Sequence, residues 1–255
     1  MRIATIADRA TVVNIIVAMF KHNPTIQFMV KNDNKTNKRI TAIAEYAFDF
    51  AVARDGVYIS DNNKGVAICY QYNLKSFTLK DIGLMIKMVF KAIHISKLFQ
   101  IFLHDNFIKS QRPVDGNYYY FWFFGVLAEE QPKISARDLT IALFEKAKIQ
   151  RIPIYAETTL EKNKKVYERF GFKVYKTWIN QTNGIQVWFM CRDFRMACYL
   201  NRLPTFSLIF LAASSVFSAT SFSTSCDFSL ASTAASINVS FKLSENFSPL
   251  SILSI

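Results

Sequence analysis

The chain has 255 residues, of which 51% are hydrophobic and 20% are charged. This composition is too apolar for an intrinsically disordered protein, and the 7 Gly and 6 Pro exclude a collagen-like or Gly/Pro-rich repeat. The net charge of +12 invites comparison with nucleic-acid-binding proteins. The basic residues, however, are spread without a long run, so we expect a solvated basic surface and no nucleic-acid partner.

The cysteines and histidines carry no metal or disulfide pattern. The four cysteines lie far apart with no Cys-x-x-Cys pair, and the three histidines share no metal-ligand spacing. We therefore expect no bound metal, and a reducing, cytoplasmic location. We also expect no N-terminal signal peptide, because the acidic Asp8 comes early and no small-residue cleavage site follows an apolar stretch.

The composition changes sharply near residue 200. This predicts a folded domain over residues 1–197 and a Ser/Thr-rich, apolar tail over residues 198–255. Residues 203–226 carry no charge and are long enough for a membrane span, but their many hydroxyl groups weaken that interpretation. A poorly ordered tail is favoured over a weak tail anchor, and an out-of-frame end of the sequence is a third alternative. Membrane contact is expected only if residues 203–226 act as that anchor.

Helical and strand patterns alternate before residue 200. In chain order, they predict helices over 7–20 and 36–53, a hairpin of strands 57–60 and 66–72, helices over 78–93 and 96–109, an aromatic strand over 118–127, a helix over 136–149, a strand over 153–158, a helix over 162–169, and a hairpin of strands 172–177 and 185–191. Asp8 is expected to cap the first helix. Together these helices and strands predict one mixed α/β domain.

The most informative segment lies between residues 118 and 172. A strand followed by a short loop and a helix start forms an anion site, because the free N–H groups of the first helical turn point at whatever binds there. Downstream, Asn163 and Tyr167 lie one helical turn apart and can address one bound molecule. Gly171 is then expected to leave the helix in a backbone conformation that other residues disfavour.

These residues also carry a resemblance. The run P-I-Y-A-E-T at 153–158, followed by N-K-K-V-Y-E-R-F-G-F at 163–172, resembles the acetyl-CoA-binding half of the GNAT superfamily of N-acetyltransferases, and is similar to the branch that includes the puromycin-type enzymes. The resemblance covers most of residues 5–192. It implies a splayed, mostly antiparallel sheet with helices on both faces, and acetyl-CoA between the strands at 118–127 and 153–158.

The resemblance also implies roles for individual residues. Main-chain groups around Gly125, Val126 and Leu127 would hold the acetyl arm, and Asn163 would help to hold the cofactor. Tyr167 would protonate the departing thiolate as the general acid. The reaction implied is direct transfer of an acetyl group to a primary amine, without a covalent enzyme intermediate.

The pyrophosphate-binding segment departs from the family pattern Q/R-x-x-G-x-G/A. Gln131 and Ala136 match it, but Ile134 stands where the first glycine belongs, and Lys133 and Ser135 fill the variable positions. A β-branched side chain is unfavourable where a backbone must approach phosphates closely. We therefore expect weakened acetyl-CoA binding, with Lys133 as a source of compensating charge. The alternative is a catalytically weakened or inactive binding module of the same fold.

The acceptor side leaves the general base open. In the puromycin-type branch a His often begins the aromatic strand, where this chain has Tyr118. An amine must lose a proton before it attacks, and a carboxylate can accept that proton directly or through water. Glu157 is the candidate base, with Tyr118 a weaker one. The acceptor, a small-molecule or peptide amine, and the oligomeric state are not assigned by the sequence.

Overall fold

The computed structural model describes residues 1–30, 33–127 and 132–194, with only the backbone described for residues 132–134. The predicted tail at 198–255 therefore lies outside the described residues. Within residues 1–194 the helices and strands form one compact unit. No helix in the described part of the chain is both long and apolar enough to cross a membrane.

Seven strands form one open sheet, in the order β1-β2-β3-β4-β5-β7-β6. The strands are β1 (Arg2–Ile3), β2 (Val57–Ile59), β3 (Gly65–Gln71), β4 (Tyr119–Val126), β5 (Ile154–Thr158), β6 (Lys173–Ile179) and β7 (Gln186–Arg192). All neighbours are antiparallel except β4 and β5, which are parallel. The mixed α/β fold with a mostly antiparallel sheet, predicted from the sequence, is confirmed.

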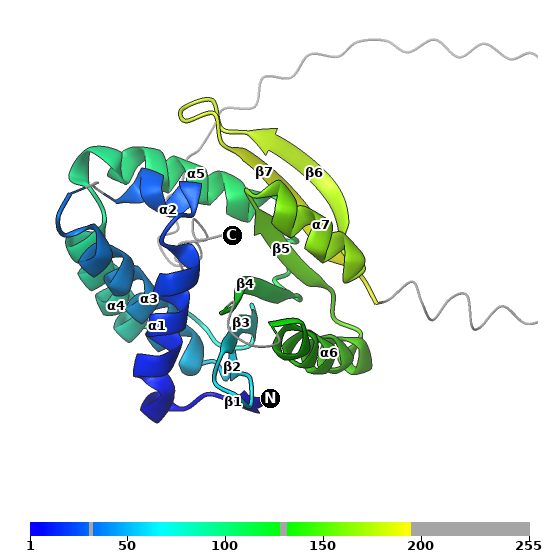
Figure 1. Cartoon of the computed structure of the whole chain (residues 1–255). Helices are drawn as coiled ribbons and strands as arrows, with labels where there is room; N and C mark the ends of the chain where they lie inside the picture. Colours follow the sequence, from blue (N-terminus) through cyan, green and yellow to red (C-terminus); the bar gives the residue numbers. More distant parts are fainter. Residues whose placement is uncertain (31–32, 128–131, 195–255) are drawn as a thin grey trace, which may run out of the picture. The chain divides into compact units, whose positions relative to one another are not determined.

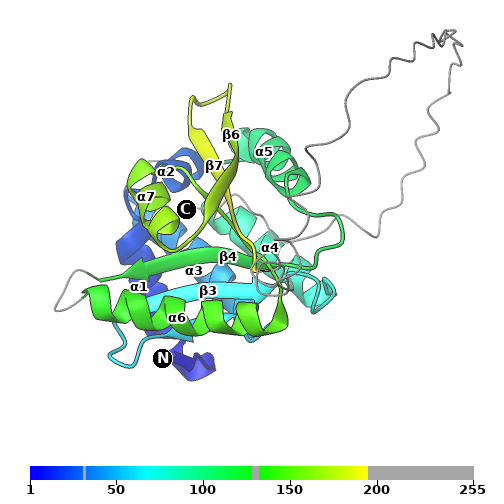
Figure 2. The same ribbon diagram turned by 90° about the vertical axis from the view of Figure 1, so that its right-hand side faces the viewer.

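Helices cover both faces of this sheet (Figure 1). The α-helices are α1 (Arg9–Phe20), α2 (Pro24–Met29), α3 (Thr36–Val52), α4 (Leu79–Ala92), α5 (Leu98–Ser110), α6 (Pro132–Gln150) and α7 (Glu161–Arg169), and short 3-10 helices precede α1 (η1, Ile6–Asp8) and α5 (η2, Ile95–Lys97). Figure 2 shows α6 lying across β3 and β4. The core on the opposite face is built from α1, α3 and the sheet.

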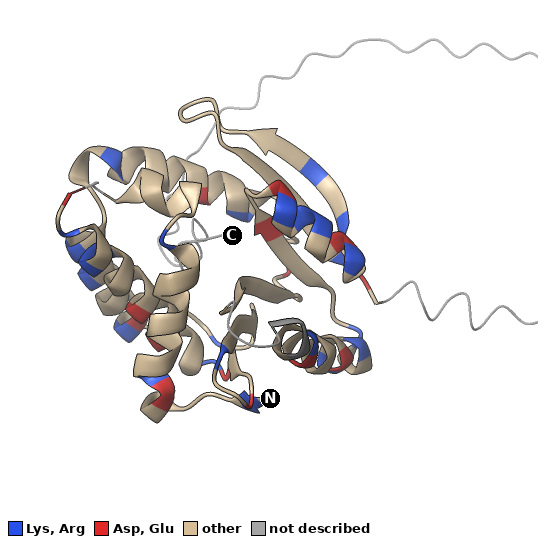
Figure 3. Ribbon diagram, viewed as in Figure 1, with Lys and Arg blue, Asp and Glu red and all other residues tan. Residues whose placement is uncertain are grey.

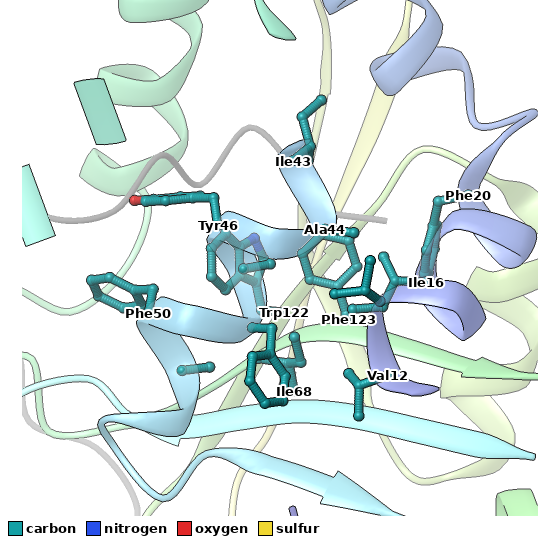
Figure 4. Close-up of a cluster of buried hydrophobic side chains, with 14 of the residues drawn as sticks. Val12, Ile16, Phe20, Ile43, Ala44, Tyr46, Phe50, Ile68, Trp122 and Phe123 are labelled. Carbon is teal, nitrogen blue, oxygen red and sulfur yellow. The ribbon is translucent and has the colours of Figure 1, made fainter. Parts of the chain in front are cut away.

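The central strand β4 is apolar on both faces because each face is covered. Its pairing with β3 contains a bulge: Phe121 pairs with Cys69 and Phe123 with Ile68, which leaves Trp122 as an extra residue. As a result Trp122 and Phe123 both point into the core beside α1 and α3 (Figure 4). Phe121 and Phe124 pack on the opposite face, under α6.

Two features of the N-terminal region differ from the sequence prediction. The first helix begins as η1, and the Asp8 side chain does not cap α1; it closes a capping box with Thr5 and pairs with Arg2 instead. Strand β1 and helix α2 were not predicted. Helix α2 is started by the Asn23 side chain, which accepts hydrogen bonds from the first-turn amides, and by a proline in the first turn.

Candidate functional site

An opening between β4 and β5 is the central feature of the candidate site. The two strands pair only at Tyr119 with Ile154 and at Tyr120 with Tyr155, and then separate (Figure 1). A sheet that opens in this way leaves main-chain groups unpaired along its inner edges, and these groups must find other partners. The opening is therefore a place where a ligand could supply hydrogen bonds.

The register identifies which main-chain groups face this opening. The Leu127 amide donates to the Lys64 carbonyl at 2.9 Å, so Leu127 points toward β3. Because residues of an antiparallel strand alternate in direction, the N–H and C=O groups of Val126 and Phe124 point the other way, toward the opening. The acetyl-arm contact at Val126 stays a prediction, and it would use the groups that point in this direction. The Leu127 amide, in contrast, is already used within the sheet.

Gly125 has a packing role in addition to its place in the predicted motif. A Cβ at this position would lie 2.8 Å from Met19 Cγ, so the glycine lets α1 approach β4 closely. The side chain of any other residue would have to displace Met19. The sequence motif located Gly125 but gave no sign of this contact with α1.

Tyr167 is presented to the same region by α7. Its ring is 4% exposed and packs between Phe121, at 5.9 Å between centroids, and Phe172, at 5.6 Å. Its hydroxyl makes no hydrogen bond with the described residues. Burial, together with the charge of Glu157, raises the pKa of Tyr167 well above its ordinary value, so the phenol keeps its proton at neutral pH.

Asn163 lies one turn before Tyr167 on the less exposed side of α7. Around these two residues α7 carries four basic and two acidic side chains (Figure 3). Lys162, Lys165 and Arg169 are exposed. The helix ends at Gly171, whose φ of 84° is the left-handed conformation predicted for it. The chain then returns directly into β6, so the predicted spacing of Asn163 and Tyr167 on one helix is confirmed.

Glu157 lies on β5 and is held by an arginine that the sequence analysis did not identify. Arg112 donates from Nε to Glu157 Oε1 at 2.7 Å and from Nη2 to Oε2 at 3.0 Å. Both side chains are almost completely buried, and the Arg112 guanidinium lies 3.8 Å from the Tyr120 ring centroid. Glu157 could therefore accept a proton only if this pairing opened.

Tyr118, the weaker candidate base, precedes β4 and is 2% exposed. Its ring stacks on Tyr72 with centroids 4.8 Å apart and meets Tyr155 edge-on at 5.2 Å. Burial raises the pKa of Tyr118, although Arg112 opposes that shift. A phenol in this state does not ionise at neutral pH, so the geometry gives Tyr118 a packing role.

The segment predicted to bind pyrophosphate is helical over most of its length. Helix α6 begins at Pro132, so the prediction that the helix starts at Ala136 was wrong, because proline fits the first turn of a helix, where its missing N–H is not needed. Ile134 thus has a helical backbone that suits an L-residue. Gln131 and the side chains of Lys133 and Ile134 lie outside the described part. Ala136 is partly exposed.

Ser135 is the first side chain of α6 that the structure describes, and it is already bonded. Asn62, in the turn between β2 and β3, donates from Nδ2 to Ser135 Oγ at 2.9 Å, and Ser135 is 4% exposed. This hydrogen bond ties the start of α6 to the β2–β3 turn. No pattern in the sequence connected these two positions.

A small cavity lies among α2, α5 and the turn between β6 and β7. It is lined by Thr25, Phe28, Ile101, His104, Asn183 and Ile185. Thr25 reaches Thr159, just after β5, at 3.5 Å, so the cavity is next to the end of that strand. His104 packs on Trp178 at 5.3 Å, and its buried Nδ1 has no hydrogen-bond partner among the described residues.

His104 should make the domain less stable in mild acid. Burial lowers the pKa of His104 from 6.5 to about 4, so the unfolded chain takes up a proton more readily than the folded one. Stability is therefore expected to fall as the pH drops from about 6.5 toward 4, by about 1–3 kcal/mol. Urea unfolding at several pH values measures this loss. His104→Phe should remove it, whereas His22→Gln, at an exposed site, should not; an equal slope in both variants would contradict the assignment.

Comparisons with known proteins support the fold. No protein-family model and no curated protein sequence matches the chain. Among solved structures, a histone acetyltransferase HPA2-related acetyltransferase from Corynebacterium glutamicum aligns with a TM-score of 0.54 at 17% identity, over 75% of this chain and 94% of that one.

Two further structures align at a TM-score of 0.50. Arylalkylamine N-acetyltransferase 2 from Aedes aegypti is 12% identical, with 76% of this chain and 97% of that chain covered. The C-terminal condensation domain of Ebony, solved with beta-alanyl-dopamine, is 11% identical, with 74% and 96% covered. Together with the splayed sheet, these likenesses establish that the chain has the GNAT fold of acetyltransferases. They do not select the puromycin-type branch, which stays a prediction.

Proposed function

We propose that this protein is an acetyl-CoA-dependent N-acetyltransferase that moves an acetyl group directly to a primary amine. The observation that carries the proposal is the opening between β4 and β5, where main-chain groups of Phe124 and Val126 face away from β3, on the strand whose Phe121 packs against Tyr167. In this fold, such an opening offers hydrogen bonds to an extended, amide-containing ligand. Acetyl-CoA has this shape and supplies an activated acyl group when bound.

Each proposed role follows from where the residue lies. The Val126 amide would polarise the thioester carbonyl, since a fixed N–H stabilises the negative charge that develops on the oxygen. Tyr167, which keeps its proton at neutral pH, would donate that proton to the departing sulfur as the C–S bond breaks. Asn163 would help to hold the cofactor from the same helix.

The amine must lose a proton during the transfer. Glu157 remains the candidate that accepts this proton, directly or through water. The ion pair between Glu157 and Arg112 would have to open before Glu157 could do so. In the Glu157→Gln variant, an unchanged pH–rate profile would remove Glu157 from this role. The acceptor is proposed only as a small-molecule or peptide amine, a class that includes the arylalkylamines named for one structural neighbour.

Release of CoA from acetyl-CoA in the presence of a panel of primary amines tests the proposal. Amine-dependent release above the hydrolysis background supports it. Binding of acetyl-CoA in calorimetry without release under any acceptor would favour the second candidate, a catalytically inactive binding module. The observation that favours this module is the departure at Ile134 from the glycine of the family pattern.

Ile134→Gly separates cofactor binding from fold stability. If the side chain crowds the pyrophosphate, removing it should tighten acetyl-CoA binding in a calorimetric titration. Because Ile134 has a helical backbone, the same change should cost about 1 kcal/mol of stability. Ile141→Gly, at an exposed position later in α6, is the matched control that should lose stability without a change in affinity. Unchanged affinity in Ile134→Gly would show that this position does not limit binding.

A further inference from the structure

The outward face of α4 carries an unusual apolar stripe. Leu79 is 86% exposed, Ile86 is 47% exposed and Phe90 is 84% exposed. These residues and Gly83 follow the spacing i, i+4, i+7 and i+11, which places them on one side of the helix. The opposite side packs toward α3 through Met88 and Ala92, which are buried. The helix is thus apolar on the side that faces away from the core.

A row of lysines runs along one flank of this stripe. Lys80, Lys87 and Lys91 are all exposed and repeat with the spacing i, i+7 and i+11. Within the residues that the structure describes, none of these three forms an ion pair. Lysines at such positions can keep their ammonium groups in a polar layer while their methylene stems lie along an apolar surface.

Asp81 on α4 and the two α3 carboxylates beside Lys87 and Lys91 are paired with arginines. Asp81, the acidic residue of α4, is buried and pairs with Arg54 at 3.0 Å. Glu45 and Asp49 of α3 line a shallow cavity together with Lys87 and Lys91, and both carboxylates bind Arg9. The outward face of α4 therefore presents positive charge in excess.

The orientation of α4 is fixed by its first turn. The Thr78 hydroxyl caps the helix by accepting a hydrogen bond from the Asp81 amide, and the Thr78 amide donates to the Asp81 carboxylate at 2.8 Å. The same carboxylate accepts hydrogen bonds from both terminal nitrogens of Arg54, a residue that follows the end of α3. These contacts hold α4 with its apolar stripe on the surface.

We propose that the outward face of α4 attaches the protein to an anionic lipid membrane. A second copy of the chain is a poor occupant, because it would present the same positively charged face, whose neighbouring carboxylates already bind Arg9 and Arg54, and so would offer no counter-charge to the lysines. A bilayer interface accepts Leu, Ile and Phe side chains among the acyl chains while the phosphates bind lysines, which matches both halves of this face. The attachment does not depend on the proposed enzymatic activity.

Sedimentation of the full-length protein with vesicles tests the attachment. Binding to phosphatidylcholine vesicles that contain phosphatidylserine should exceed binding to phosphatidylcholine alone, and should weaken as salt is added. Ile86→Ser with Phe90→Ser should lower the partition coefficient at least about tenfold, because two exposed apolar side chains no longer insert. Changing Lys80, Lys87 and Lys91 to Gln should lower it about fivefold for each lysine.

Matched controls lie on α6. Ile149→Ser removes an apolar side chain that is 79% exposed, and Lys148→Gln removes an exposed charge; both should bind vesicles like the unchanged protein. The proposal is overturned if neither kind of vesicle binds the protein in a low-salt buffer. It is also overturned if the α4 variants bind vesicles as well as the unchanged chain does, because the contact would then lie elsewhere, for example at residues 203–226. It is equally overturned if the α4 variants lose only self-association or binding to an acidic protein.

Discussion

Replacing Tyr167 with phenylalanine is expected to lower kcat by at least about 100-fold, since loss of a positioned general acid removes a contribution of this size. Acetyl-CoA affinity should be preserved, because the aromatic ring still packs between Phe121 and Phe172. Thermal stability should also be preserved, because the lost hydroxyl has no hydrogen-bond partner among the described residues. Steady-state rates of CoA release, a calorimetric titration and a melting curve measure the three quantities.

Tyr119→Phe is the matched control for this variant. Tyr119 lies on β4, two residues before Phe121, against which Tyr167 packs. The Tyr119→Phe variant also loses a single hydroxyl, which in the unchanged protein donates to Gln150 at 2.6 Å. We expect normal turnover in Tyr119→Phe, with at most a small loss of stability from the missing hydrogen bond. If Tyr167→Phe turned over as fast as Tyr119→Phe, proton donation would have to come from another group.

Removal of Arg112 is expected to have the largest effect on stability. Arg112→Met would leave Glu157 buried without its partner, and breaking a buried ion pair in this way costs about 3–5 kcal/mol. The double change Arg112→Met with Glu157→Met should recover most of that loss, because the remaining surface is apolar. Urea unfolding of the two single variants and the double variant gives the coupling between the residues.

A third variant separates charge from geometry at the same place. Arg112→Lys keeps the positive charge but cannot form the two-pronged contact with Glu157 or lie flat over Tyr120. We expect it to fall between the unchanged protein and Arg112→Met in stability. Additive losses in the Arg112 and Glu157 single variants would mean that the pair is not a coupled unit.

Most of the fold could be predicted from the sequence because its elements are long and strongly patterned. The pattern around Phe121 predicted a strand over 118–127. The observed strand β4 begins one residue later and ends one residue earlier than this prediction. Strand β1 was missed because two residues are too few to show a period. Helix α2 was missed although Asn23 and Pro24 are a recognisable start signal.

The candidate site could be predicted only where a motif lies within one stretch of chain. Asn163, Tyr167 and Gly171 are close in sequence, and the structure keeps the predicted helix and turn. The partners of Glu157 and Ser135 could not be found, because Arg112 and Asn62 come from segments 45 and 73 residues away. Long-range pairs of this kind leave no local pattern.

The extra residue at Trp122 also determines how β4 can change over evolution. Exchange of one aromatic side chain for another in the buried part of this strand changes the packed volume but leaves the direction of the later residues unchanged. Deletion of a single residue there would remove the bulge and reverse the facing of every later position, so that Gly125 would turn away from α1 and the Val126 amide would rotate toward β3. The length of this strand is therefore expected to be more strictly preserved among descendants of this sequence than the identity of its rings.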